Sequence, residues 1–153
     1  MAGLKIHNSE WVVVCDGGKA LILENAGDAV FPDLRTREAY EQKPAANHQA
    51  DNDEPGRVFA STGTRRSSVE QNDLHEQSER KFLKTLASRL DAAVNGGEVK
   101  ALILVAPPRA LGMLRQVYSP HVRRAIRTEL EKDYVKLPVP EIENHLCGTV
   151  RKR

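Results

Sequence analysis

Residues 99–106 read Val-Lys-Ala-Leu-Ile-Leu-Val-Ala, and the segment is continuously apolar from its third residue onward. A short run that is apolar on both faces is typical of a central, parallel strand with other elements packed against each side. Pro107 and Pro108 follow directly, and proline is favoured in the first turn of a helix. They predict a helix that ends near Val117. This stretch therefore predicts an α/β protein.

The segment before this strand predicts a long helix over residues 74–94. Asp73 is placed to cap it, because an aspartate side chain accepts hydrogen bonds from the free N–H groups of a first turn. A single apolar stripe at helical spacing follows, formed by Phe82, Leu86, Leu90 and Val94 with Leu83 and Ala87 beside them. Asn95-Gly96-Gly97 ends the helix, since glycine accepts the left-handed backbone found there.

The amino-terminal part predicts a β-hairpin followed by a third strand. Trp11–Cys15 and Ala20–Glu24 are two apolar runs, and the residues between them include an Asp-Gly-Gly turn. Leu34–Glu41 alternates apolar and charged residues, as a half-exposed strand does. A hairpin joined to a right-handed β-α-β crossover predicts a mixed β-sheet with helices on both faces. The order of elements matches a ribonuclease-H-like layout, a likeness of fold that does not imply activity.

The carboxyl-terminal part predicts two further helices. Ser119-Pro120 has the form of a cap followed by a first-turn proline, and it predicts a helix. Apolar residues at a spacing of four extend that helix through Val122, Ile126 and Leu130. Pro138 and Pro140 interrupt the chain, and a last short helix is expected from Glu141 to Cys147.

Length and composition favour one domain over residues 1–153. Residues 43–56 have only alanine as apolar content and predict a flexible loop, and residues 148–153 predict a basic tail. No apolar run approaches the roughly 20 residues of a membrane span. No secretory signal is visible in Met1–Glu10, so reduced cysteines and a cytoplasmic location are expected. No oligomeric state follows from these features.

The net charge of +2 is unevenly distributed. From Pro107 onward ten basic and five acidic residues give +5, and the remainder of the chain carries −3. A basic end of this kind suggests a polyanionic partner. The alternative is a solvated helix face followed by a basic tail.

Arginines are the candidate binding residues. Arg123 and Arg127 are expected one turn apart on a helix face, and Arg109 lies in a first turn whose free N–H groups favour anions. The full set proposed to contact phosphates is Arg57, Arg65, Arg66, Arg109, Arg115, Arg123, Arg127 and Lys132. The alternative for such a set is ordinary surface with salt bridges.

The sequence predicts no catalytic residue, metal site or cofactor. Asp16 ends the first strand, where a two-metal nuclease places a carboxylate, and Glu76 or Glu79 could add a second. The strand at residues 99–106 supplies no acid, so a turn role for Asp16 is favoured. Cys15 is expected in the core. The histidines lack zinc-ligand spacing, being His7, His48, His75, His121 and His145.

Four segments together resemble the bacterial host attachment protein family, also described as protein required for attachment to host cells. They are Trp11–Ala20, Gly56–Phe59, Ala106–Arg115 and Glu131–Asp133, and the resemblance spans about residues 9–147. Its motif positions here include Asp16, Gly112 and Asp133. The family is similar to the middle domain of archaeal and eukaryotic class 1 peptide-chain release factors, which implies a ribonuclease-H-like fold and a cytosolic, ribosome- or RNA-linked role.

The release-factor domain carries a Gly-Gly-Gln tripeptide that acts in peptidyl-tRNA hydrolysis. Here Gly17-Gly18 precedes Lys19, and Gly96-Gly97 precedes Glu98. Neither pair is followed by glutamine, so the resemblance does not carry that activity to this chain.

Three functional hypotheses follow. The first is a non-enzymatic protein that binds the ribosome or structured RNA. The second is a factor in adhesion or surface interaction with host cells, which the family name alone supports. The third is a hydrolase acting on RNA or peptidyl-tRNA through Asp16 and an acid from the long helix. A protein partner is the alternative to RNA for the first hypothesis. A purely structural role for the motif is the alternative: Gly112 would allow close helix packing, Arg115 would pair with Asp133, and Lys132 would cap a helix.

Overall fold

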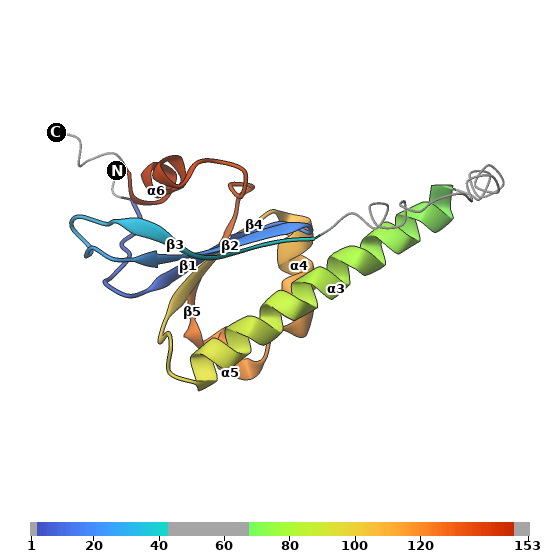
Figure 1. The fold of residues 1–153 in the computed structure, drawn as a ribbon, viewed down its shortest axis with the longest axis horizontal. Coiled ribbons are helices and arrows are strands. Elements are labelled where there is room, and N and C mark those ends of the chain that lie inside the picture. Colours follow the sequence, from blue (N-terminus) through green and yellow to red (C-terminus); the bar gives the residue numbers. More distant parts are fainter. Residues whose placement is uncertain (1–2, 43–67, 149–153) are drawn as a thin grey trace.

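The computed structural model describes residues 3–42 and 68–148 and contains one five-stranded sheet. Its strands lie in the order β3-β2-β1-β4-β5. Strand β2 is antiparallel to β1 and β3, whereas β1, β4 and β5 are parallel (Figure 1). The strands are β1 (Trp11–Cys15), β2 (Lys19–Asn25), β3 (Leu34–Glu41), β4 (Leu102–Ala106) and β5 (Ile126–Glu131). The predicted mixed sheet is confirmed, and the ribonuclease-H likeness stays a prediction.

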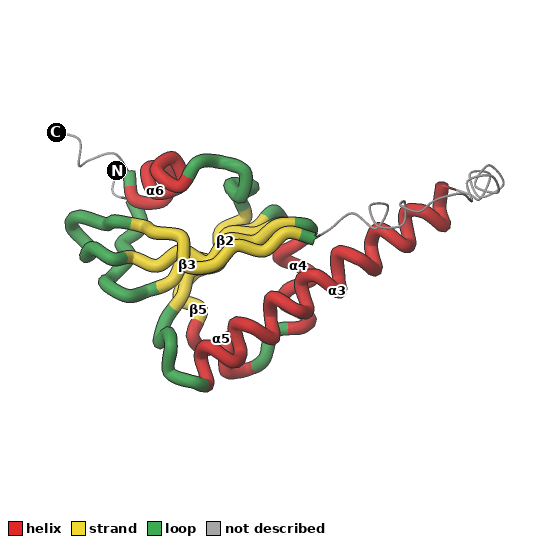
Figure 2. The backbone as a smooth tube through the Cα atoms, in the orientation of Figure 1, coloured by secondary structure: helices red, strands yellow, loops and turns green. Residues whose placement is uncertain are grey.

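Helices cover both faces of the sheet, as predicted (Figure 2). Three lie on one side, and α6 lies on the other. The helices are α3 (Ser68–Asn95), α4 (Pro108–Val117), α5 (Pro120–Ala125) and α6 (Val139–Cys147). The predicted loop at 43–56, the arginines at 57, 65 and 66, the Gly56–Phe59 motif and residues 149–153 of the predicted tail fall outside the described residues.

Strand β1 lies at the centre of the sheet and divides the core. Trp11, Val13 and Cys15 are buried against the α3 side, while Val12 and Val14 are buried against the α6 side. All five residues of β4 are buried as well. The apolar run of β4 is continuous because both faces of a central parallel strand are covered by other elements. This pattern is what predicted the strand from the sequence.

Helix α3 begins earlier than the apolar stripe indicated. It starts at Ser68, and Asp73 is an exposed residue inside it, so the prediction that Asp73 caps the helix was wrong. Aspartate is a weak but tolerated helix residue when its side chain faces water. The predicted end at Gly96-Gly97 is confirmed: α3 ends at Asn95, and Gly97 has the left-handed φ of 81°.

The helix predicted through Leu130 was wrong. Ser119 caps α5 by accepting a hydrogen bond from the Val122 N–H at 3.1 Å, but the helix ends at Ala125. Ile126–Glu131 is instead strand β5, which pairs with β4. Residues 126, 128 and 130 are all spaced by two, so the segment also fits a strand, and pairing with an existing sheet edge decides between the two patterns.

The last helix also begins earlier than predicted. It starts at Val139 rather than Glu141, with Pro140 in its first turn, where proline is tolerated. Pro140 therefore lies inside α6 and does not interrupt the regular structure, contrary to the prediction.

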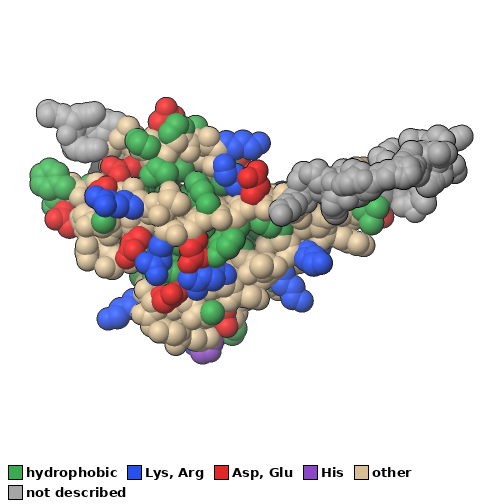
Figure 3. Space-filling view, viewed as in Figure 1, with side chains coloured by type: hydrophobic (Ala, Val, Ile, Leu, Met, Phe, Trp, Pro, Cys, Tyr) green, Lys and Arg blue, Asp and Glu red, His purple; other side chains and the backbone are tan. Residues whose placement is uncertain are grey.

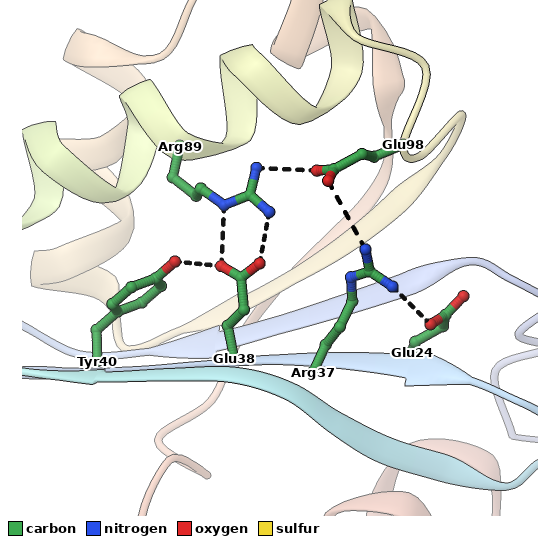
Figure 4. A network of polar contacts seen from close by, with 6 residues as sticks. All are labelled: Glu24, Arg37, Glu38, Tyr40, Arg89 and Glu98. Atoms are coloured by element: carbon green, nitrogen blue, oxygen red, sulfur yellow. Dashed lines mark hydrogen bonds and ion pairs between the residues drawn. The ribbon is translucent and has the colours of Figure 1, made fainter.

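A network of charged side chains attaches α3 to the edge strand β3 (Figure 4). Arg89 on α3 bonds both carboxylate oxygens of Glu38 and reaches Glu98 at 2.9 Å. Arg37 bridges Glu98 and Glu24 at 3.7 and 3.0 Å. The hydrogen bonds from Arg89 hold the pKa of Glu38 below its usual value.

Candidate anion-binding interface

Three of the predicted arginines line one hollow beside the sheet edge formed by β5. Arg115 comes from α4, Arg123 from α5, and Arg127 from β5 itself. The hollow has a volume of about 440 Å³. Its other lining residues are Tyr118, Ile126, Thr128 and Glu129. Arg123 and Arg127 do not share a helix face as predicted, because the helix ends between them, but the fold still brings them together.

Glu129 organises one wall of the hollow. Arg115 donates to one of its oxygens through Nε at 2.9 Å and Nη2 at 2.7 Å, and the Tyr118 hydroxyl donates to the other. Burial and this hydrogen bond raise the pKa of Tyr118 to about 12. Burial by itself would raise the pKa of Glu129, but the donors Tyr118 and Arg115 outweigh it and lower that pKa.

Arg123 and Arg127 are held differently. The Arg123 guanidinium lies 5.2 Å from the centroid of the Tyr118 ring, a cation–π contact. It makes no salt bridge within the described part of the chain, although its charge helps to lower the pKa of Glu129. Arg127 donates to both oxygens of Glu10 at 2.9 Å and to the Lys5 carbonyl at 2.6 Å. Of the three arginines that line this hollow, Arg123 is therefore the one that is held by an aromatic ring and not by a salt bridge.

Arg109 lies at the other end of α4, in a second hollow of about 510 Å³. This hollow lies beyond the carboxyl ends of β1 and β4 and is also lined by Asp16, His75, Glu79 and Lys136. Arg109 donates twice to one oxygen of Glu79, at 3.0 and 2.9 Å. The predicted single basic set is thus divided between two places, and three of its four described arginines are paired with carboxylates.

Asp16 has the turn role that the sequence favoured. One of its carboxylate oxygens accepts hydrogen bonds from the N–H groups of Gly18 and Lys19 at 2.8 and 2.9 Å. Glu79 lies close by, since a Cβ added to Gly17 would be 2.7–2.8 Å from its side chain. In the described part of the chain, no group of three or more histidine, cysteine, aspartate or glutamate residues is placed to hold a metal ion. Cys15 is fully buried, and burial raises its pKa to about 12.

The purely structural roles predicted for Arg115, Gly112 and Lys132 were wrong. Arg115 pairs with Glu129 and not with Asp133. A Cβ on Gly112 would meet nothing within 4 Å, so this glycine does not permit close helix packing. Lys132 follows β5, where its N–H donates to the carbonyls of Ala106 and Leu130, and it caps no helix.

Sequence reasoning missed the residues that position these arginines. Glu10 lies 117 residues before Arg127, and Tyr118 lies 11 residues before Glu129. Such pairings depend on sheet topology and leave no local pattern. The one available signal was Tyr118 itself, an aromatic residue between two arginine-bearing segments.

The fold and this interface define a small α/β protein with a solvent-open, arginine-lined hollow at a sheet edge. Comparison with known families is more specific: the profile described as "Protein required for attachment to host cells" matches residues 11–146. The chain therefore belongs to that family. None of the curated proteins compared with it matches.

Among solved structures, the chain is similar to the crystal structure of an archaeal translation termination factor. The two are 12% identical with a TM-score of 0.47, and the match covers 87% of this chain and 34% of the other, so this chain spans about a third of that protein. Across residues 3–42 and 68–148, no helix has both the length and the hydropathy that crossing a membrane requires.

Proposed function

We propose that this member of the family is a non-enzymatic binding protein whose partner is structured RNA, such as that of the ribosome, in the cytoplasm. One observation carries the proposal: Arg115, Arg123 and Arg127 come from three different elements and line the same open hollow. Guanidinium groups bind phosphate oxygens through paired hydrogen bonds, which makes arginine suited to an RNA backbone.

The existing ion pairs set the cost of this role. The side chains of Arg115 and Arg127 are 47% and 34% exposed, whereas those of their partners Glu129 and Glu10 are 21% and 12% exposed. Each pair therefore lies between an exposed pair, worth about 0–1 kcal/mol, and a fully buried one, and a phosphate that replaces the carboxylate must offset that contribution. Arg123 breaks no salt bridge of the described chain on binding a phosphate, since its guanidinium contacts the Tyr118 ring.

Salt dependence tests the proposal. Each neutralised phosphate contributes about 0.9 to the slope of log affinity against log salt, so three arginine contacts predict a slope of about −2.7. Raising salt fourfold, from about 50 to about 200 mM, would then weaken binding about 40-fold. The measurements are co-sedimentation with purified ribosomes, with and without RNase, and fluorescence anisotropy with a labelled ribosomal stem-loop.

The variant Arg115→Ala/Arg123→Ala should reduce the slope to about −0.9, leaving one contact. The matched control is Arg35→Ala, which removes an arginine that is 70% exposed and bonded to Asp33, on the opposite edge of the sheet. Arg109→Ala forms a separate arm and shows whether the second hollow contributes. Equal binding by the double variant and the Arg35 control would refute the proposal.

A further inference from the structure

The connection between β2 and β3 presents two large apolar side chains to solvent. Val30 is 71% exposed and Phe31 is 69% exposed, the two highest values among the large exposed hydrophobic residues of the described chain. They are consecutive and lie at the apex of residues 26–33. An apolar tip is visible at the left end of Figure 3, where this connection leaves the sheet.

This connection is fixed from beneath by a buried side chain. Asn25 has no exposed surface, and its amide nitrogen donates to the Ile6 carbonyl at 2.7 Å. Its side-chain oxygen accepts hydrogen bonds from the N–H groups of Gly27 at 2.9 Å and Asp33 at 2.8 Å. A buried asparagine with its polar atoms satisfied in this way holds both ends of the connection in one arrangement.

The apex is fixed from within by Asp28. One oxygen of its carboxylate accepts hydrogen bonds from the N–H groups of Val30 at 3.0 Å and Phe31 at 2.8 Å, and its own N–H donates to the Phe31 carbonyl at 3.1 Å. A Cβ on Gly27 would lie 2.2 Å from that same carbonyl, so the chain closes too tightly there for a larger residue.

Rigid presentation of an exposed aromatic residue has a physical consequence. Burying Phe31 would be favourable, yet the hydrogen bonds of the loop hold it in water. A loop already ordered in its exposed form loses little conformational entropy on association, and aromatic anchors of this kind dominate binding energy in protein interfaces.

The charges beside the apex indicate what could cover it. Asp28 and Asp33 flank Val30 and Phe31, and the neighbouring Arg35 already donates to Asp33 at 2.9 and 3.1 Å. With Asp33 paired to Arg35, the carboxylate of Asp28 supplies the negative charge of this border. An anionic membrane surface would repel that charge, whereas a basic border on a protein would attract it. We propose that residues 26–33 form a docking loop that inserts Phe31 and Val30 into an apolar pocket with a basic border on a partner protein.

The first experiment places a benzophenone amino acid at position 31 of the full chain in living cells, with position 74 as the matched control. Leu74 is 61% exposed on α3, away from the loop. Illumination should produce a protein adduct at position 31 that position 74 does not produce. The adduct is identified, and that partner is purified and titrated with the native chain, Phe31→Ser and Leu74→Ser.

The expected result is an affinity at least about tenfold weaker for Phe31→Ser, with Leu74→Ser within about twofold of the native chain. Phe31→Ser should keep the native melting temperature, because the side chain is exposed. Equal affinities, a large fall in melting temperature, or no adduct specific to position 31 would overturn the proposal. So would Phe31-dependent binding to phosphatidylglycerol vesicles or Phe31-dependent self-association, which would assign the loop to a membrane or to a second copy.

Discussion

Replacing Arg89 by methionine removes the centre of the network between α3 and β3 while keeping most of the aliphatic length of the side chain. Arg89 contacts Glu38 and Glu98, and its guanidinium lies 5.8 Å from the ring centroid of Trp11. The side chains of Arg89 and Glu38 are 27% and 24% exposed. They lie between an exposed pair, worth about 0–1 kcal/mol, and a fully buried one, whose loss costs about 3–5 kcal/mol.

We therefore expect Arg89→Met to lower the free energy of unfolding by about 2 kcal/mol and the melting temperature by about 4–8 °C. Trp11 is the sole tryptophan and is fully buried, so its fluorescence reports unfolding. Arg80→Met is the control, because Arg80 is on the same helix in a pair with Glu76 whose side chains are 49% and 41% exposed. That variant should lose no more than about 0.5 kcal/mol.

Lowering the pH gives a second test, because the direction of its effect on the stability difference can be predicted. The folded pKa of Glu38 is lowered, chiefly by its hydrogen bonds to Arg89. A lowered carboxyl pKa stabilises the fold above the unfolded value of about 4.3, and this contribution is lost as pH falls through the folded pKa. The difference between Arg89→Met and the native chain should therefore shrink in acid. A loss no greater than that of Arg80→Met, or a difference unaffected by pH, would refute the reasoning.

Three further predictions concern glycines and a thiol. Gly17→Ala should lower the free energy of unfolding by no more than about 1 kcal/mol in urea titration, because the new Cβ would displace the carboxylate end of Glu79 from its pair with Arg109, whereas Gly18→Ala should cause no loss, since nothing lies within 4 Å. Equal losses would contradict that contact. Gly112→Ala should raise stability by about 0.5–1 kcal/mol, because a helix-interior glycine with open space around it gains from a methyl group; destabilisation on heating would show a packing role. Cys15 should react with a thiol reagent at pH 8 only as fast as the chain unfolds, because burial raises its pKa to about 12, and mass spectrometry after timed labelling would reveal any faster reaction.

The parts of the fold that sequence could predict are those with a local cause. The Asp16-Gly17-Gly18 turn, the apolar run of β4 and the prolines that begin α4 each specify backbone geometry within a few residues. Strand β5 could not be predicted, because Ile126 and Leu130 satisfy helical and extended spacing equally. The neighbouring edge of β4 supplies the hydrogen bonds that decide between them.

The candidate interface likewise contains residues that the sequence could predict and residues that it could not. A count of basic residues identified Arg115, Arg123 and Arg127, because charge is visible without a fold. Their partners were not visible, since Glu10 and Arg127 meet only when β5 lies at the end of the sheet. The pairing state of each arginine is therefore a property of the topology and not of its neighbours in sequence.

Helix α3 has 28 residues and strand β1 has 5, or about 42 Å of helix beside about 17 Å of strand. One end of α3 extends beyond the sheet (Figure 1). Residues 72–75 are all exposed, whereas Ser78 and Glu79 bond Gln42 and Arg109, and the first fully buried side chain from residue 72 onward is that of Leu83. Tertiary packing supplies most of the stability of a helix in water. Amide hydrogens should therefore exchange rapidly in the part of α3 that precedes Ser78 and slowly beyond Leu83. One continuous helix thus combines a mobile arm with an anchored base, and binding at the arm could be detected as slowed exchange.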